Sequence, residues 1–316
     1  MSGKLSDRRR REATHRDLTR LLADGGPLHD PPPPVSAFLT EDLLDEVTDE
    51  YRRLKPAGEI GGKAVIITAG PPGAGKSQAL RTLLNRHRRI DPDEIKSLIL
   101  DKLERAGLLD SRRLHTLSDA DPVSPAELSL WVHKAANDVA EDARLISLSL
   151  QENFAMEGTL QWDKLPADYS VELADSDYEE LTVLDIEVRR SVAIEQAKDR
   201  WWVARHDGTP LGGRFMADES FDRYYPDRPE VSITATRARE LYDSALAAGV
   251  EVRIACVSRD ASGTQHTAVV SENGVSGWPT PGPLQKAPRG AVCIHCGRTL
   301  RTDHSIARGI GPTCVV

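Results

Sequence analysis

Residues 70–77 read GPPGAGKS, and this octapeptide constrains the fold more than any other part of the chain. It fits the phosphate-binding pattern G-x-x-x-x-G-K-[ST] at every fixed position. Residues 63–69 before it are apolar and β-branched, which predicts a buried strand, and residues 77–87 after it have the composition of a helix. Strand, glycine loop and helix follow in the order that points backbone N–H groups and a helix N-terminus at a phosphate chain.

The Lys-Ser pair that ends the motif separates it from a glycine-rich turn that binds nothing. We expect Lys76 to reach the β- and γ-phosphates of ATP and the Ser77 hydroxyl to ligate Mg²⁺. The predicted nucleotide-binding residues are Gly70, Pro71, Pro72, Gly73, Ala74, Gly75, Lys76 and Ser77.

Composition narrows the class of protein. The 316 residues carry a net charge of −8, which argues against broad nucleic-acid binding, and no apolar run is long enough to span a membrane. The N-terminus is polar and basic, so no secretory signal is visible. Three of the four cysteines lie after residue 290, which is not the pattern of a disulfide framework. We therefore expect a cytoplasmic protein.

Strand and helix patterns alternate downstream of the motif, which predicts an α/β fold with a mainly parallel sheet flanked by helices. Ligands of such sheets gather at the carboxyl ends of the strands. The expected strands are 64–69, 89–91, 154–157, 181–188 and 250–257, with a hairpin arm at 267–275. The expected helices are 91–106, 125–151, 190–205 and 234–248.

Four regions are predicted along the chain. Residues 1–60 form a helical extension with a proline-rich break, 61–275 the α/β domain that contains the phosphate loop, 276–290 a linker and 291–316 a small module. The extension contains a helix at 36–54 and the basic run Arg8–Arg11, which reads better as a solvated helix face than as a nucleic-acid arm. The extension could also restrain the domain in cis. Residues 163–180 are acidic and poor in helix signals.

A phosphate loop alone does not distinguish a kinase from a motor or switch ATPase. A kinase also needs a base for the acceptor and cations over the transferring phosphoryl group. Asp91 and Asp93 follow a short strand, and either carboxylate could take the proton of an acceptor hydroxyl, although both also suit a helix start. Further polar groups at strand ends and on later elements are Glu157, Thr159, Arg200 and Arg214.

The combination resembles the zeta-toxin family of small P-loop kinases over about residues 61–257. The residues that carry the resemblance are GPPGAGKS, IDPDEIK, MEGT, a helix that contains KDRWW, GGRF and ARELYDSALAAGVEVRIACV. The resemblance implies an ATP-dependent kinase that phosphorylates a hydroxyl of a nucleotide sugar such as UDP-N-acetylglucosamine and acts as the toxin of a toxin–antitoxin pair. It also implies a separate antitoxin as partner.

The resemblance assigns a role to each of these residues. It selects Asp93 over Asp91 as the catalytic aspartate, with Lys76, Arg200 and Arg214 as the other catalytic groups. It places Glu157 and Thr159, with Asp93, in substrate binding. Leu160-Gln161-Trp162 departs from the Gly and Arg that often follow in the family, which puts the identity of the acceptor in doubt. The alternatives are a polynucleotide-end or antibiotic kinase and a nucleic-acid-associated ATPase switch.

The C-terminal cysteines predict a zinc site. Cys293 and Cys296 have the spacing of a zinc knuckle, and Cys314 supplies a third thiolate. His304 is the best fourth ligand, with His295 and Asp303 as alternatives. A module this short has little core, so a structural Zn²⁺ would account for its folding. The region resembles small zinc-ribbon-like modules with the pattern CxxCGR…GPxC.

Overall fold

A computed structural model describes residues 2–81, 83–259 and 265–271. The described chain forms two compact units, each assembled from three separate stretches. The sheet unit comprises Lys55–Asp91, Arg144–Ile194 and the described residues from Phe221 onward. The helical unit comprises the described residues up to Leu54, together with Pro92–Ala143 and Glu195–Ser220.

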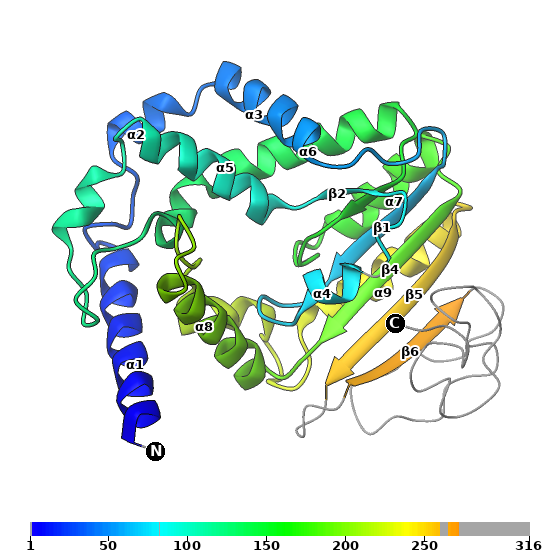
Figure 1. Cartoon of the computed structure of the whole chain (residues 1–316). Helices are drawn as coiled ribbons and strands as arrows, with labels where there is room; N and C mark the ends of the chain where they lie inside the picture. The colour runs from blue at the N-terminus through cyan, green and yellow to red at the C-terminus, as the bar shows by residue number, and fades with distance from the viewer. Residues whose placement is uncertain (1, 82, 260–264, 272–316) are drawn as a thin grey trace. The chain divides into compact units, whose positions relative to one another are not determined.

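The sheet unit is built on a six-stranded sheet with the order β2-β3-β1-β4-β5-β6 (Figure 1). The strands from β2 to β5 pair in parallel, and β6 is antiparallel to β5. Because β1 lies between β3 and β4, the loop that follows β1 is flanked by the carboxyl ends of two other strands. The strands are β1 (Ala64–Ala69), β2 (Arg88–Ile90), β3 (Phe154–Met156), β4 (Glu180–Glu187), β5 (Glu251–Arg259) and β6 (Gln265–Ser271).

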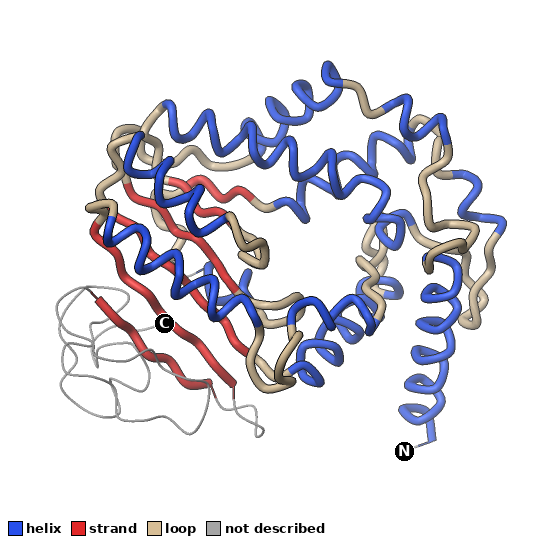
Figure 2. The backbone as a smooth tube through the Cα atoms, turned by 180° about the vertical axis from the view of Figure 1, so that it is seen from behind, coloured by secondary structure: helices blue, strands red, loops and turns tan. Residues whose placement is uncertain are grey.

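Helices cover both faces of this sheet. Helices α7 (Leu165–Asp175) and α9 (Ile233–Ala247) pack against each other on one face, and α4 (Lys76–Arg81) lies on the other (Figure 2). A parallel sheet covered on both sides needs apolar residues on both faces of its strands. This is why Val65 and Ile66, neighbours that point to opposite faces, are both buried.

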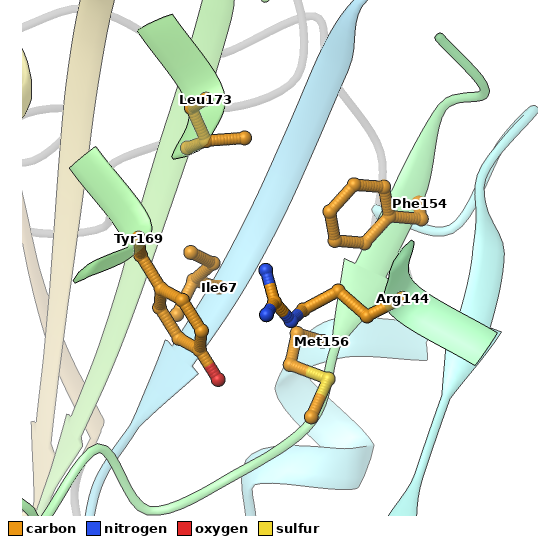
Figure 3. Close-up of a pocket in the computed structure, with 6 residues that line it drawn as sticks. All are labelled: Ile67, Arg144, Phe154, Met156, Tyr169 and Leu173. Carbon is orange, nitrogen blue, oxygen red and sulfur yellow. The ribbon is translucent and has the colours of Figure 1, made fainter. Parts of the chain in front are cut away.

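A small cavity lies in the sheet unit beside β1 and β3 (Figure 3). Its volume of about 10 Å³ is at the lower limit for one water molecule, so it has no room for a larger ligand. The buried guanidinium of Arg144 forms an ion pair with Glu172 and lies 5.1 Å from the ring centroid of Tyr169. These contacts fasten α7 in place. The cavity is lined by Ile67, Arg144, Phe154, Met156, Tyr169 and Leu173.

The helical unit is formed by helices from three parts of the chain. Helix α3 packs on α5, and α5 packs on η2, which begins at a capping box of Ser124 and Glu127. Helix α6 begins in this unit, and most of α8 belongs to it. The elements are α1 (Ser2–Leu22), α2 (Pro33–Phe38), α3 (Glu41–Leu54), α5 (Pro92–Arg105), η1 (Asp110–Leu114), η2 (Pro125–Val132), α6 (His133–Ser149) and α8 (Arg190–His206). The 3-10 helix η3 (Asp218–Tyr224) begins in the helical unit and ends in the sheet unit.

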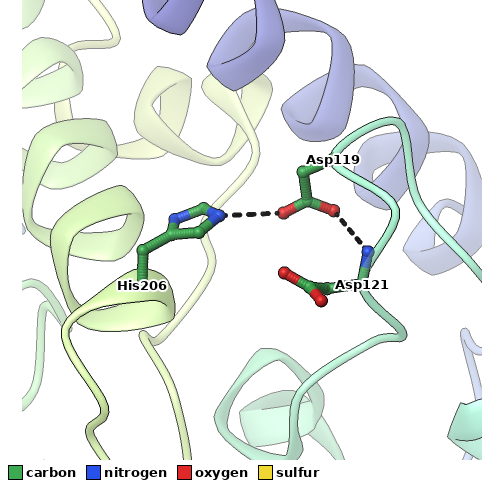
Figure 4. A group of neighbouring side chains, drawn as sticks. All are labelled: Asp119, Asp121 and His206. Atoms are coloured by element: carbon green, nitrogen blue, oxygen red, sulfur yellow. Dashed lines mark hydrogen bonds and ion pairs between the residues drawn. The ribbon is translucent and has the colours of Figure 1, made fainter.

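A buried ion-pair network fixes α8 within the helical unit. Arg205 donates to Asp119 at 2.5 Å and to Glu127 at 2.8 Å, and neither carboxylate side chain is exposed to solvent. His206 Nε2 also lies 3.3 Å from Asp119, with Asp121 close by (Figure 4). Because Arg205 already balances the charge of Asp119, we read this cluster as a structural network rather than a cation site.

Most predicted elements are confirmed, with four differences. The helix expected over 125–151 is divided into the 3-10 helix η2 (Pro125–Val132), which is kinked at Leu128, and α6 (His133–Ser149). The helix expected over 36–54 is interrupted after Phe38, where the Thr40 hydroxyl accepts a hydrogen bond from Leu43 N at the start of α3. Helix α4 ends at Arg81, well before residue 87. Residues 163–180 contain α7, and its apolar residues recur every four positions, which is a helical spacing. The predicted linker 276–290 and module 291–316 lie outside the described residues.

Candidate active site

The phosphate loop follows β1 directly, and α4 begins at Lys76. Gly70 has φ of 136°, and a Cβ atom there would lie 2.4 Å from the carbonyl oxygen of Ile186 on β4. Only glycine can adopt this conformation and leave room for the neighbouring strand. The loop therefore rests directly on the carboxyl end of β4.

Lys76 reaches back over the loop. Its ammonium group donates to the carbonyl oxygens of Gly70 and Pro71, each at 2.9 Å. These contacts hold the positive charge above the loop backbone, where the predicted phosphate chain would lie.

Ser77 opens a chain of polar contacts along the carboxyl edge of the sheet. Its hydroxyl donates to Glu157 Oε1, and Glu157 Oε2 accepts from Arg89 Nε at 2.8 Å and Nη2 at 2.5 Å. Arg89 Nη2 also donates to Asp91 Oδ2 at 2.8 Å. Glu157 and Asp91 are both buried. We call Ser77, Glu157, Arg89 and Asp91 the edge network.

The loop that contains Thr159 is fastened to β1. The Thr68 hydroxyl donates to Gly158 O and accepts from Gly158 N, both at 2.9 Å, and Thr159 O accepts from Gly70 N at 3.3 Å. Glu157 and Thr159 therefore both lie beside the phosphate loop, as their positions at a strand end predict. Arg89, which holds Glu157, is not predicted as a site residue, because nothing local marks one arginine of a basic stretch.

Two acidic residues on β4 were also missed. Asp185 pairs in register with Ala69, the last residue of β1, and Glu187 follows it two residues later on the same face. Burial, reinforced by the charge of Glu187, raises the pKa of Asp185, whose Oδ2 accepts from Cys256 Sγ at 3.4 Å. Glu187 accepts from the Ser232 hydroxyl at 2.7 Å and thereby fixes the start of α9. The sequence did contain a signal for these two residues, because two acids stand in an otherwise apolar predicted strand.

Asp93 lies in the first turn of α5, within the helical unit. Its carboxylate accepts from Lys96 Nζ at 3.1 Å and pairs with Arg214 Nη2 at 3.3 Å, while Arg214 Nη1 donates to the Asp93 backbone carbonyl at 3.1 Å. Burial alone would raise the pKa of Asp93, but the charges of Arg214, Lys96 and Arg200 outweigh it and lower the pKa well below the usual range. The side chain is 39% exposed, so an ionised carboxylate stays accessible.

The Arg214 loop is packed onto α8. A Cβ atom on Gly213 would lie 2.2 Å from the carbonyl oxygen of Trp201, and Leu211 O accepts from Ala126 N at 2.8 Å. Arg214 Nε is buried and has no hydrogen-bond partner among the described residues. The helical unit thus brings Asp93, Arg214 and the charge of Arg200 together, as predicted, and adds Lys96 to them.

Two family models match the chain. A model described as Zeta toxin matches residues 48–243, which is more than half of the chain and includes the phosphate loop, the edge network and the Asp93–Arg214 pair. The chain belongs to the zeta toxin family. This membership supports an ATP-dependent phosphotransferase of the toxin type. A second model, described as a family of unknown function (DUF6011), matches residues 285–316, which contain the predicted zinc ligands.

Several solved structures are similar to this zeta toxin family member. One is the complex of AvrRxo1-ORF1 with AvrRxo1-ORF2 and sulphate ions, at 14% identity and a TM-score of 0.48, over 76% of this chain and 71% of that chain. Another comes from the PezAT toxin–antitoxin system of Streptococcus pneumoniae, at 16% identity and a TM-score of 0.45, over 72% and 79% of the two chains. A comparison with curated proteins finds no match.

The predicted site residues divide between the two units. Lys76, Ser77, Glu157 and Thr159 lie together in the sheet unit, and Asp93 and Arg214 lie together in the helical unit. No described helix is both long and apolar enough to cross a membrane. The predicted zinc ligands Cys293, Cys296, His304 and Cys314 lie outside the described residues.

Proposed function

We propose that this protein transfers the γ-phosphoryl group of ATP to a hydroxyl of a nucleotide sugar such as UDP-N-acetylglucosamine, and that it is the toxin of a toxin–antitoxin pair. The observation that carries the proposal is the ionised, accessible Asp93 held between Lys96 and Arg214. A switch or motor ATPase needs the phosphate loop but not a carboxylate for an acceptor hydroxyl. Family membership supports the toxin assignment.

The phosphate loop supplies the donor half of the reaction. Gly70 leaves the loop backbone open to a phosphate chain, and Lys76 moves its ammonium group from the loop carbonyls to the β- and γ-phosphates. The oxygen atoms of Ser77 and Glu157 suit Mg²⁺, which prefers hard oxygen ligands and, when bound, neutralises phosphate charge. The donors present therefore fit a magnesium nucleotide.

Glu157 acts, in this proposal, on the nucleotide side rather than on the acceptor. Its two carboxylate oxygens are engaged by Ser77 and Arg89 within the sheet unit. The resemblance implied that Glu157 binds the acceptor substrate, whereas these contacts favour a role beside the nucleotide and its Mg²⁺. Thr159 keeps its proposed role in acceptor binding, because its backbone carbonyl holds the loop by accepting from Gly70 N and this bond does not use its hydroxyl.

Asp93 orients the acceptor hydroxyl and receives its proton. The acceptor oxygen forms a bond to the γ-phosphorus while the bond between that phosphorus and the β,γ-bridging oxygen breaks, and ADP leaves. Because the pKa of Asp93 is lowered, the carboxylate is a weak base, so the proton moves late, when the new oxygen–phosphorus bond has already acidified the hydroxyl. Arg200 and Arg214 stabilise the charge on the transferring group.

Purified protein tests the assignment. Asp93→Asn and Lys76→Ala are incubated with labelled ATP and UDP-N-acetylglucosamine, and we expect each to lose at least about 100-fold in phosphorylation rate. Asp101→Asn is the matched control, because Asp101 is a partly exposed acid on the same helix α5. Wild-type activity in Asp93→Asn or Lys76→Ala would reject the proposed roles.

The same assay separates the alternative functions. Labelled oligonucleotide ends or a labelled antibiotic, in place of the nucleotide sugar, would assign a different acceptor. ATP hydrolysis that DNA or RNA stimulates, with no phosphorylated small product, would assign a switch ATPase. Growth arrest on expression, relieved by a second protein encoded beside this one, tests the toxin–antitoxin assignment.

A further inference from the structure

Helix α1 lies before the residues that the zeta toxin model matches. Within the helical unit it contacts α8, the helix that bears Arg200. Arg11 is buried and forms ion pairs with Glu195, at 2.6 Å, and with Asp199 on α8. Glu12 accepts from Lys198 Nζ at 3.2 Å, and Asp7 accepts from Trp202 Nε1 at 3.3 Å. The residues that α8 contributes fall on one side of the helix.

His15 extends these contacts to the loop that bears Arg214. Its Nε2 lies 3.2 Å from the carbonyl oxygen of Met216, and its ring centroid lies 4.7 Å from that of Phe215 and 5.6 Å from that of Trp201. Burial, followed by the charge of Lys198, lowers the pKa of His15, so the neutral ring donates its Nε2 proton to Met216. Met216 is only two residues beyond Arg214.

The loop is thereby held from two sides within the helical unit. Gly213 rests on the backbone of Trp201, and Phe215 and Met216 rest on His15. Arg214 stands between these anchor points, where it pairs with Asp93. Arg200 is one residue after Asp199, about 100° further around α8, so it projects from the same helical turn that Arg11 contacts.

We propose that α1 is a positioning element of the phosphoryl-transfer machinery, and that His15 and Arg11 hold Arg214 and Arg200 in their working places. This inference rests on the proposed function, which makes those two arginines catalytic. It is the opposite of restraint in cis: loss of the α1 contacts lowers activity instead of releasing it. His15 and Arg11 are positioning residues, because they touch neither substrate nor reacting atoms.

Two full-length variants test the proposal without deleting the helix. His15→Leu keeps a similar volume and removes the hydrogen-bond donor, and Arg11→Met removes the buried charge from the α8 contact. We expect kcat to fall about 10- to 100-fold, since a displacement of about 1 Å has that effect on transfer, while KM for ATP stays within about twofold. His15→Gln, which keeps an N–H donor, recovers most of the activity. Arg9→Met, at an exposed position of α1, is the matched control.

Hydrogen exchange gives a readout that does not depend on catalysis. We expect faster amide exchange in residues 207–218 of His15→Leu and Arg11→Met, and unchanged exchange in residues 64–77 of the phosphate loop. The assay uses ATP and UDP-N-acetylglucosamine, with wild-type protein in parallel.

The exchange and kcat measurements together decide whether α1 positions the Arg214 loop. Faster exchange at 207–218 together with the fall in kcat supports the proposal. Unchanged exchange there, or a kcat that stays the same or rises, overturns it, and a rise would establish restraint. If wild-type protein transfers no phosphate, the proposed function fails separately, and exchange at 207–218 alone still decides whether α1 holds the loop.

Discussion

Arg89 offers a direct test of the edge network. Replacing Arg89 by Met keeps much of its length but removes the two hydrogen bonds to Glu157, at 2.8 and 2.5 Å, and the one to Asp91, at 2.8 Å. Both carboxylates then lie buried without the charge of Arg89. Removing one partner of a buried pair costs about 3–5 kcal/mol, and the 23% exposure of the Arg89 side chain reduces our expectation to about 2–4 kcal/mol.

The matched control is Arg86→Met. Arg86 also donates to a glutamate at 2.5 Å, but its side chain is 71% exposed and that of its partner Glu59 is 37% exposed. An exposed pair of this kind contributes about 0–1 kcal/mol. Two arginines three residues apart should therefore differ in effect, because Arg89 lies in a buried network with two carboxylates and Arg86 in a single exposed pair.

Native-state hydrogen exchange in residues 88–90 and 154–158 measures the local opening free energy. A double-mutant cycle of Arg89→Met with Glu157→Gln should give a coupling energy of about 1.5–3 kcal/mol. Coupling below about 0.5 kcal/mol, or an Arg89→Met effect no larger than that of Arg86→Met, would refute the reasoning that this network is a buried, mutually dependent unit.

Three further predictions follow from the charges and from the cysteines. Arg214→Met raises the pKa of Asp93, so the acid limb of the kcat–pH profile moves upward, while kcat falls about 100- to 1,000-fold; an unmoved limb would contradict the assigned pair. Burial raises the pKa of Asp185 in the fold, whereas in the unfolded chain the group ionises above pH about 4. The folded state therefore holds this proton more tightly, and Asp185 makes stability decline with rising pH. Asp185→Asn should flatten that decline in urea unfolding between pH 5 and pH 8, and an unchanged slope would argue against a neutral Asp185. Protein purified without chelator should contain about one zinc ion per chain, lost in Cys293→Ser, and much less zinc would reject the site.

Local patterns account for the parts of the structure that were predicted well. The apolar run of β1, the glycine loop and the start of α4 are encoded within about 20 consecutive residues, because each depends on backbone conformation and immediate burial. The end of the short strand before Asp91 is also a local signal, because Pro92 favours a helix start and so marks where the strand must stop. Helix α7 was overlooked because its acidic residues hid the apolar spacing of Leu165, Tyr169 and Leu173.

Long-range pairs account for what was not predicted. Arg89 and Glu157 are 68 residues apart in sequence, and only the pairing of β2 with β3 brings them together. Asp185 is an acid within an apolar strand, but its burial depends on β1 and β5, which pair with β4 on its two sides. Lys96 was within reach of prediction, because a residue three positions after Asp93 on a helix faces it.

The pairing of Asp93 with Arg214 has a consequence for biosynthesis. The two residues are separated by 121 positions, so a nascent chain that has just exposed Asp93 already carries Lys96 but must be extended that far before Arg214 exists. At about 5–20 residues per second, translation needs roughly 6–25 seconds for this stretch. During that interval the ribosome-bound chain carries a complete phosphate loop but lacks the arginine that the proposed transfer requires. A cell that makes this protein would thus have a brief window in which a partner could engage the growing polypeptide before phosphoryl transfer begins.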